Sequence, residues 1–259
     1  MTYAAKFWIH HIRAMGWQTK AISKRIVTLL SQENGAYRYW LRIHDPEYPR
    51  KGEAIWGYSP YKLLPAPLYL ASLCGLVETS RLLLKRNDDV NAVGGRYGNA
   101  LQVAAHRGDK NLVKLLLEAG ADANAQGGDY GNALQAAAYR GHEELVKMLL
   151  DAGADVDANI GGYGSALRAA SWAGHTHVIK ILLAAGADIQ AQSTGYGSPL
   201  QVASLQGHQS TVQLLLDKGI NVNAQGGYHG SAIQAASAKY SKDATQRWRR
   251  RQCTERSLR

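Results

Sequence analysis

Three kinds of residue in this sequence could do chemistry: a run of arginines, a few histidines and two cysteines. Arg249, Arg250 and Arg251 stand in a row near the C-terminus, where they could bind nucleic-acid phosphates or act as a nuclear address. Cys74 and Cys253 lie far apart and match no zinc or redox spacing. The histidines near the N-terminus are too few and too scattered for a metal site. We therefore predict no metal, no cofactor and no disulfide framework.

The positive charge of the chain is concentrated at its two ends. The formal net charge is +10, and residues 1–64 hold 10 lysines and arginines against 4 acidic residues. Residues 65–240 hold 13 against 14, and residues 241–259 hold 7 against 2. The middle of the chain is electrically balanced, which argues against nucleic-acid binding by this section.

The composition indicates a folded protein. Apolar residues make up 46% of the sequence, which is enough to bury a core. Apolar runs such as LVKLLL are too short to cross a bilayer, and the N-terminus carries charges and histidines where a secretory signal would be apolar. We expect an intracellular protein without a membrane span, located in the cytoplasm or alternatively in the nucleus.

A period of 33 residues organises the middle of the chain. The segment NALQVAAHRGDKNLVKLLLEAGADANAQGGDYG is followed by three further copies of the same length. A less regular copy precedes them, and SAIQAASAK begins another copy that does not finish. The copies occupy residues 66–98, 99–131, 132–164, 165–197, 198–230 and, in part, 231–240.

Each copy predicts two short helices and a projecting turn. A polar residue caps the first helix, and a glycine ends it in the left-handed conformation. The caps are Asn99, Asn132, Ser165, Ser198 and Ser231, and the glycines are Gly108, Gly141, Gly174 and Gly207. The second helix carries an apolar stripe, which in the third copy consists of Leu145, Val146, Leu149 and Leu150. The glycine-rich segment that follows predicts a tight turn.

The period and segments such as GADANAQ (120–126) and GINVNAQ (219–225) resemble the ankyrin repeat, over residues 66 to about 239. That family's first helix usually opens with Thr-Pro-Leu-His, whereas this sequence has NALQ or SALR, and only the copy at Ser198 keeps the proline. Glutamine and arginine cannot make the hydrogen bonds of that histidine, so the local network must differ. The positions concerned are Gln102, Gln135, Arg168 and Gln201.

The junctions YGNALQ and YGSALR also resemble the repeats at the C-termini of fungal NACHT–ankyrin proteins, which are signalling ATPases of non-self recognition. YRYWLRIHDPE (37–47) and the passage from Trp56 through SPYKLLPAPLYLASLCGL (59–76) are similar to the junction between a helical arm and the first repeat in that family. The sequence contains no GxxxxGK[ST] phosphate loop, so the family's nucleotide chemistry is not implied. The resemblance implies the sensor end of such a protein without its ATPase.

These patterns predict an all-α fold, namely an ankyrin-repeat solenoid of helix–turn–helix repeats with projecting β-turn fingers, preceded by a small helical arm. We expect the arm at residues 1–58, the repeats at 59–240 and a basic, disordered or frameshifted tail at 241–259. Residues 4–43 of the arm predict two or three amphipathic helices. Their lysines and arginines suit the solvated face of a helical cap on the solenoid, with acidic lipid or nucleic acid as the alternatives.

Partner-binding residues of such a stack are expected at the fingertips and at the solvent-facing ends of the first helices. The pair before each helix-ending glycine includes large apolar side chains where a purely solvated surface would be polar. Aromatic and arginine side chains on a rigid face are common interface anchors. For Trp172, the alternative is a ring that lies flat against an adjacent turn. The candidates are His106, Arg107, Tyr139, Arg140, Trp172, Leu205 and Gln206 at the helix ends, and Arg96, Asp129, Thr194 and Tyr228 at the fingertips.

Two further columns of residues are predicted to be structural. A tyrosine recurs beside each fingertip, and we expect each ring to pack on the neighbouring turn. These residues are Tyr97, Tyr130, Tyr163 and Tyr196, with His229 in the corresponding place of the fifth copy. A histidine follows the helix-ending glycine at His142, His175 and His208, which matches the family's Gly-His turn. We expect no catalytic role for these histidines.

The sequence favours a non-enzymatic module that binds a protein and takes no small-molecule substrate. An enzyme with a catalytic N-terminal arm is the weaker alternative, because the arm contains no nucleophile–base motif, carboxylate pair or metal cluster. Nucleic-acid binding through the basic ends is the other alternative, and its affinity would fall steeply with salt.

A change of reading frame explains the basic tail better than a nucleic-acid signal does. The segment from Arg247 to Arg256 can be encoded by DNA that gives DGADVNAQS when it is read one base later, and this is the motif of the repeat itself. Trp248 has a single codon, which forces the glycine in the shifted frame. We therefore expect a frameshift that cut a longer array short, and sequencing the transcript across this point tests it.

Overall fold

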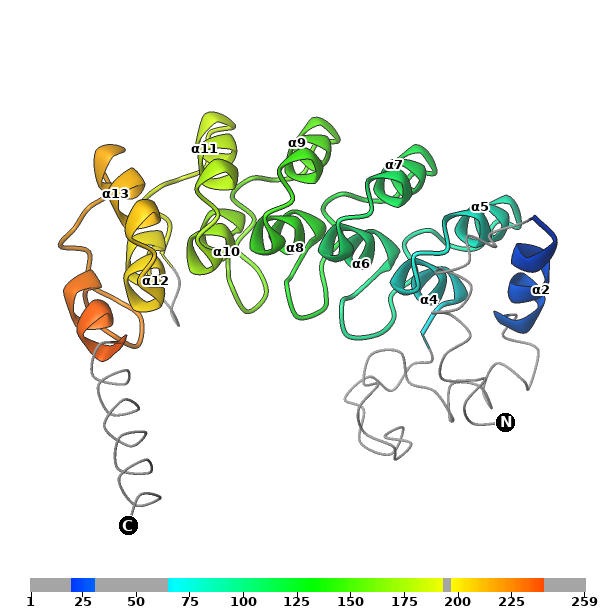
Figure 1. Cartoon of the computed structure of the whole chain (residues 1–259), viewed down its shortest axis with the longest axis horizontal. Coiled ribbons are helices and arrows are strands. Elements are labelled where there is room, and N and C mark those ends of the chain that lie inside the picture. The colour runs from blue at the N-terminus through cyan, green and yellow to red at the C-terminus, as the bar shows by residue number, and fades with distance from the viewer. Residues whose placement is uncertain (1–19, 31–64, 193–196, 240–259) are drawn as a thin grey trace, which may run out of the picture.

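Pairs of short helices stack side by side along the molecule (Figure 1). The computed structural model describes residues 20–30, 65–192 and 197–239. One row contains the first helix of each pair: α4 (Pro67–Leu73), α6 (Ala100–Arg107), α8 (Ala133–Arg140), α10 (Ala166–Ala173) and α12 (Pro199–Gln206). The other row contains the second helices: α5 (Val77–Lys85), α7 (Lys110–Glu118), α9 (Glu143–Asp151), α11 (Thr176–Ala184) and α13 (Gln209–Asp217). A further helix spans 232–239. The predicted all-α solenoid is confirmed.

Glycine-rich fingers connect each second helix to the next first helix and project from one side of the stack (Figure 1). The fingers that lie wholly within the described residues close on themselves through the backbone. The N–H of Gly127 donates to the carbonyl of Gly131 at 2.8 Å, and the N–H of Ile160 donates to that of Gly164 at 2.7 Å. Within the described ranges, these pairs are isolated bridges rather than strands. The projecting turns therefore hold their shape by hydrogen bonds between glycine-rich backbone segments.

Capping explains where the first helices begin and end. The side chain of Asn99 accepts a hydrogen bond from the N–H of Gln102, and the side chain of Gln102 accepts one from the N–H of Asn99. The helix ends at Gly108, whose φ of 80° is left-handed. The predicted caps are confirmed throughout, because the corresponding side chains accept in the same way at Asn132, Ser165, Ser198 and Ser231.

Alanines in the first helices let neighbouring pairs approach closely. Helix α8 packs between α6 and α10, and its Ala136, Ala137 and Ala138 are all fully buried. The second helix α9 buries Leu145, Val146 and Leu149, as predicted, and exposes Glu143, Glu144 and Lys147 to solvent. Leu150, the fourth residue of the predicted stripe, is half-buried against the same core. The core is therefore a continuous layer between consecutive repeats rather than one central cluster.

Helix α2 (Lys20–Leu30) covers the N-terminal end of the stack, next to α5 (Figure 1). It buries Ile26 and Leu30 there. In the adjacent first repeat, Asn87 takes the left-handed conformation (φ 61°) that glycine has in the later copies. The other helices predicted for the arm, together with Thr194, Tyr196 and the basic tail, lie outside the described residues.

Candidate functional site

In three repeats a buried glutamine near the start of the first helix joins the repeat to the finger that follows it. The side-chain nitrogen of Gln102 donates to the carbonyls of Ala125, Gly127 and Gly131 at 3.0, 3.2 and 3.1 Å. Its oxygen accepts from Asn99, so one side chain satisfies backbone groups of the helix and of the finger. This network lies at the position where the ankyrin pattern that the sequence resembles usually has a histidine. The sequence predicted a difference there, but it did not identify these partners.

We call this set the clamp column: Tyr69, Gln102, Gln135, Arg168 and Gln201. Gln135 donates to the carbonyls of Ala158 and Gly164, and Gln201 repeats the pattern on its own finger. In the first repeat, the hydroxyl of Tyr69 accepts from the N–H of Tyr97 at 3.2 Å. Glycine is required beside the clamp, because a Cβ on Gly98 would lie 1.7 Å from the side-chain oxygen of Gln102. The clamps therefore set the position of each finger.

Arg168 is the exception in the clamp column. Its side chain is only 2% exposed, and Nη1 donates to the carbonyl of Gly197 at 3.4 Å. Within the described part of the chain, its buried Nε and Nη2 have no hydrogen-bond partner. Burial lowers the pKa of this guanidinium to about 10, so it is still charged at neutral pH. A buried cation with unpaired donors destabilises the fold, so we expect this repeat to be a weak point of the stack.

In three copies a histidine follows the helix-ending glycine and ties its repeat to the previous one. Nε2 of His142 donates to the carbonyl of His106 at 3.3 Å, and His175 and His208 donate to the carbonyls of Tyr139 and Trp172 at 3.1 and 2.9 Å. The predicted structural role of these histidines is confirmed. The three acceptor carbonyls belong to candidate partner-binding residues, so these bonds fix the backbone that carries His106, Tyr139 and Trp172.

A third set of bonds holds the bases of the fingers in register. The side chain of Asn91 accepts from the N–H of Asp122 at 2.8 Å, and Asn124 accepts from Asp155 at 2.7 Å. Asp157 and Gln190 continue the series toward the C-terminus. Helix ends and fingers are thus both held by bonds between adjacent repeats, which makes the face between them a preorganised surface.

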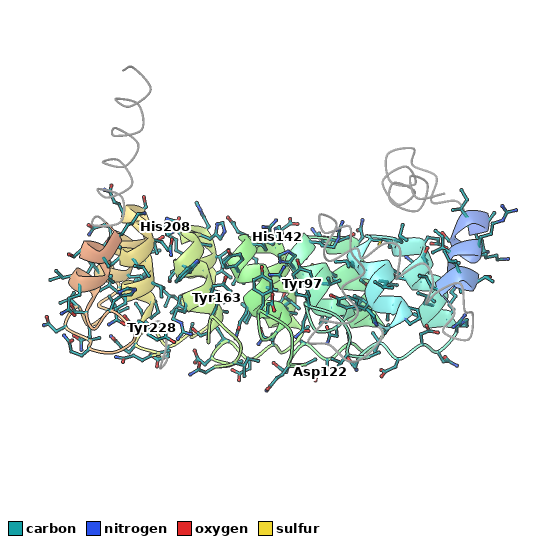
Figure 2. The ribbon with its side chains drawn as sticks, turned by 90° about the horizontal axis from the view of Figure 1, so that it is seen from below. Tyr97, Asp122, His142, Tyr163, His208 and Tyr228 are labelled. Atoms are coloured by element: carbon teal, nitrogen blue, oxygen red, sulfur yellow. The ribbon has the colours of Figure 1, made fainter. Side chains whose placement is uncertain are left out.

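Six aromatic rings lie in contact along this face, and we call them the ring column: Tyr97, His106, Tyr130, Tyr139, Tyr163 and Trp172. His106 lies 4.5 Å from Tyr97 and 5.1 Å from Tyr130, measured between ring centroids. Tyr139 lies in the same way between Tyr130 and Tyr163, at 5.3 and 4.8 Å. In Figure 2, Tyr97 and Tyr163 lie along the middle of the molecule, between the edge with His142 and His208 and the edge with Asp122. The predicted packing of the tyrosines at 97, 130 and 163 is confirmed.

The helix-end candidates contribute the other half of the ring column. His106 and Tyr139 come from the ends of α6 and α8, and the tyrosines come from the fingers. The ring of Trp172 meets that of Tyr163 edge-on, with centroids 6.1 Å apart and planes at 69°. The structure therefore brings His106, Tyr139 and Trp172 together with finger residues that the sequence assigned to a separate column.

The remaining candidates differ in exposure. Arg107, Arg140 and Asp129 are exposed, and Tyr228 is 77% exposed on a later finger. Leu205 and Gln206 are half-buried at the end of α12, where the carbonyl of Gln206 accepts from Lys239. Thr194 lies outside the described residues. The candidates from Arg96 to Trp172 thus lie in or next to the ring column in the chain, and Leu205, Gln206 and Tyr228 lie in later repeats.

Two fingertip candidates bind each other across adjacent fingers. Arg96 forms an ion pair with Asp129, and the N–H of Asp129 donates to the carbonyl of Arg96 at 3.0 Å. The guanidinium of Arg96 also lies 5.8 Å from the centroid of the Tyr97 ring. Asp129 is therefore already engaged by a cation before any partner arrives.

We predict that protonation of His106 weakens the fold. Burial, and then the positive charges of Arg140, His142, Arg107 and Arg96, lower the pKa of His106 from 6.5 to about 4. Because the unfolded chain takes up this proton more readily, the contribution of His106 to stability should be lost as the pH falls from 6.5 to 4. After allowance for solvent screening, the loss should be about 1–2 kcal/mol.

Urea denaturation at pH 7 and pH 5 of the wild type and of His106→Gln measures this effect. The glutamine variant should lose less stability between the two pH values, while carboxylates and the other histidines contribute equally to both proteins. Equal losses in the two proteins would contradict the assignment to His106.

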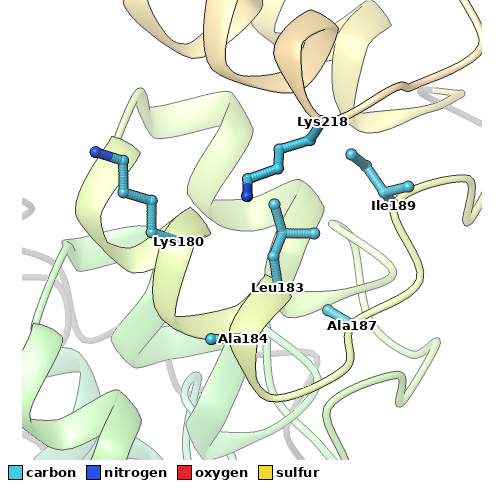
Figure 3. A pocket seen from close by; sticks show the side chains of 6 residues that line it. All are labelled: Lys180, Leu183, Ala184, Ala187, Ile189 and Lys218. Carbon is cyan, nitrogen blue, oxygen red and sulfur yellow. The ribbon is translucent and has the colours of Figure 1, made fainter.

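Two hollows lie between α11 and α13, in the row of second helices, which we call the outer row. One, of about 500 Å³, is lined by Lys180, Leu183, Ala184, Ala187, Ile189 and Lys218. Figure 3 shows that the side chain of Lys218 extends over the pocket toward Leu183. The other, of about 570 Å³, adjoins Thr176, Gln209 and Asp217. Neither is lined by a candidate partner-binding residue.

Within the described ranges, no group of three or more His, Cys, Asp or Glu side chains lies close enough together to hold a metal ion. None of the helices in those ranges is long and apolar enough to span a membrane.

Comparison with known proteins identifies the family of the repeats. A family model described as ankyrin repeats (3 copies) matches residues 68–160, 101–193 and 161–226. The chain is also 38% identical over 120 residues to the azaphilone pigments biosynthesis cluster protein L of Monascus ruber. That alignment covers 43% of this chain and 25% of the relative, so the chain matches about a quarter of that protein's length.

Proposed function

The chain belongs to the ankyrin-repeat family, and we propose from this premise that it is a non-enzymatic module that binds a protein. The observation that carries the proposal is the ring column, a row of partly buried aromatic side chains bordered by arginines. Clamps and Gly-His bonds hold its backbone, so little conformational entropy is lost when a partner binds. Aromatic and arginine side chains are also the residue types enriched in interface hot spots.

The titratable groups at the ring column support binding rather than catalysis. His142, His175 and His208 each donate Nε2 to a backbone carbonyl, and Arg96 pairs with Asp129. A general acid or base needs a group that can exchange a proton with a substrate at neutral pH. These groups serve the scaffold instead, and the low pKa of His106 keeps it neutral at pH 7.

We propose further that this module is the recognition end of a fungal NACHT–ankyrin type of receptor that acts inside the cell. The YGNALQ style of junction and the segment at 59–76 support this origin, and the two distant cysteines suit a reducing compartment. Sequencing the genomic locus and its transcripts tests it. A phosphate-binding loop encoded in frame upstream is expected, and its absence from every transcript would contradict the receptor origin while leaving protein binding intact.

We predict that Tyr139→Ala combined with Trp172→Ala abolishes capture of the partner. Loss of two aromatic anchors should weaken binding by roughly a thousandfold, since hot-spot residues contribute about 2 kcal/mol or more each. The measurement is affinity capture from a lysate of the source organism, followed by mass spectrometry and titration of the captured protein.

The matched control is Glu144→Ala with Lys147→Ala, which removes two exposed side chains from α9 in the outer row. Circular dichroism and urea denaturation establish that both double variants fold. The proposal fails if no protein is captured by the wild type, or if the ring-column variant captures it as well as the α9 variant does.

A further inference from the structure

The smaller hollow between α11 and α13 has an apolar floor and two cations beside it. Its volume of about 500 Å³ lies within the range of roughly 300–1,000 Å³ that small-ligand sites occupy. Lys180 comes from α11, and Lys218 comes from the C-terminal end of α13 and extends over the pocket toward Leu183 (Figure 3). The floor consists of Leu183, Ala184, Ala187 and Ile189. Such a hollow can hold a ligand with an apolar part and an anionic group.

Both ammonium groups are available to a ligand. Among the described residues, neither lysine forms an ion pair. The two acidic residues that adjoin this hollow in the chain do not line it, and both accept hydrogen bonds elsewhere. Asp188 accepts from the N–H of Gln190 at the base of a finger, and Asp217 accepts from the side chain of Gln213 on its own helix, each at 2.8 Å.

Two departures from the repeat pattern produce this arrangement. The position of Lys218 carries alanine in the three copies before it, at 119, 152 and 185. The position of Ala184 is acidic in the other three regular copies, as Glu118, Asp151 and Asp217. The first departure adds a cation to the hollow, and the second removes an anion from its floor.

The missing acidic residue also explains why Lys180 is unpaired. In α7, Lys114 forms an ion pair with Glu118, four positions later on the same helix, at 3.9 Å. In α11, the residue four positions after Lys180 is Ala184. The lysine is therefore retained while its partner within the helix is replaced by a methyl group that belongs to the floor of the hollow.

The helix ends select the kind of anion. Both α11 and α13 end at this hollow, and the C-terminal end of a helix carries partial negative charge. This field disfavours a doubly charged phosphate ester, whereas two ammonium groups can bind a singly charged carboxylate. None of the six lining residues is aromatic, so an aliphatic chain fits the floor better than a flat ring does.

We propose that this hollow binds an aliphatic carboxylate, with the chain on the apolar floor and the carboxylate between Lys180 and Lys218. This is a small-ligand site on the outer row, and none of its lining residues belongs to the ring column. The proposal therefore goes beyond the protein-binding function and does not depend on it.

The test is an NMR titration of the full chain with decanoate, decyltrimethylammonium and acetate, each below the concentration at which it forms micelles. Decanoate should bind saturably, with one ligand per chain and the largest amide shifts around Leu183, Ala187 and Lys218. Decyltrimethylammonium has the same chain with a cationic head, and acetate has the head without the chain. Neither should saturate the site.

One double variant restores the residue types of the other copies and is therefore expected to fold. Ala184→Asp with Lys218→Ala should weaken decanoate binding at least tenfold. The matched control is Lys114→Ala with Ala119→Asp, which makes the same change in net charge on α7 and should change affinity less than twofold. Circular dichroism checks that both variants are folded.

The reciprocal variant transfers the site to the preceding pair of helices. Asp151→Ala with Ala185→Lys gives the surface between α9 and α11 the same alanine and lysine, next to Lys147 at the position equivalent to Lys180. The number of decanoate molecules bound per chain should rise from one to two. The proposal is wrong if decanoate does not saturate, if decyltrimethylammonium binds as tightly, or if the restoring variant and its α7 control weaken binding equally. A reciprocal variant that still binds one decanoate would likewise contradict it.

Discussion

Replacing Gly141 with alanine should lower the free energy of unfolding by about 3 kcal/mol. Gly141 has a φ of 75°, and an added Cβ would lie 2.6 Å from the ring of His175. That ring donates to the carbonyl of Tyr139, so moving it breaks the bond between two repeats. The left-handed backbone costs about 1 kcal/mol for alanine, and the clash with its lost hydrogen bond adds about 2.

Gly153 provides the matched control. It has a similar φ of 84°, but a Cβ there would meet nothing within 4 Å. Gly153→Ala should therefore lose only about 1 kcal/mol, the cost of the left-handed conformation. Urea denaturation of both variants measures the difference. In a double-mutant cycle, His175→Ala should reduce the loss caused by Gly141→Ala, and strictly additive losses would show that the clash with the ring is not its cause.

Replacing Arg168 with glutamine should stabilise the protein by about 1–3 kcal/mol. The change removes a buried cation whose Nε and Nη2 are unpaired. The change also supplies a side-chain amide that can donate hydrogen bonds. In the preceding repeat, the amide of Gln135 donates to the carbonyls of the residues 23 and 29 positions later. The equivalent carbonyls for position 168 are those of Ala191 and Gly197. Most substitutions of buried residues destabilise, so an increase in stability is a distinctive outcome.

The midpoints of thermal and urea unfolding measure this increase, and the reverse change, Gln135→Arg, is its counterpart. It should destabilise by a similar amount, because it introduces the same unpaired cation in place of an amide that donates to the carbonyls of Ala158 and Gly164. A lower midpoint for Arg168→Gln would mean that the arginine contributes more to the fold than its single bond to Gly197 indicates.

The elements that the sequence predicted correctly are those decided by neighbouring residues. The cap at Asn99 and the left-handed Gly108 depend on bonds that span a few positions, so composition and order were sufficient. The apolar stripe of α9 followed from its helical spacing. The Gly-His turns and the tyrosine packing followed from their recurrence at the same repeat position.

The contacts that the sequence did not predict depend on the shape of the next repeat. The acceptors of Gln102 are backbone carbonyls 23 to 29 positions away, and their direction is set by a finger rich in glycine. Arg168 was expected to differ from a histidine, but its burial was not foreseen, since arginine is seldom buried without a partner. The ring contacts that His106 and Tyr139 make with the finger tyrosines depend on the distance between the helix ends and the fingers, which the sequence does not show.

The bonds between repeats have constant sequence offsets. The clamp from Gln135 to Gly164 spans 29 positions, the bond from Asn124 to Asp155 spans 31, and the bond from His175 to Tyr139 spans 36. Because the unit itself is 33 residues long, inserting or deleting one whole unit with a glutamine clamp and a Gly-His turn keeps these three kinds of bond in register at the new junction. Tandem duplication can therefore change the length of the array without any compensating mutation, whereas an insertion of another length displaces all three kinds of bond at once.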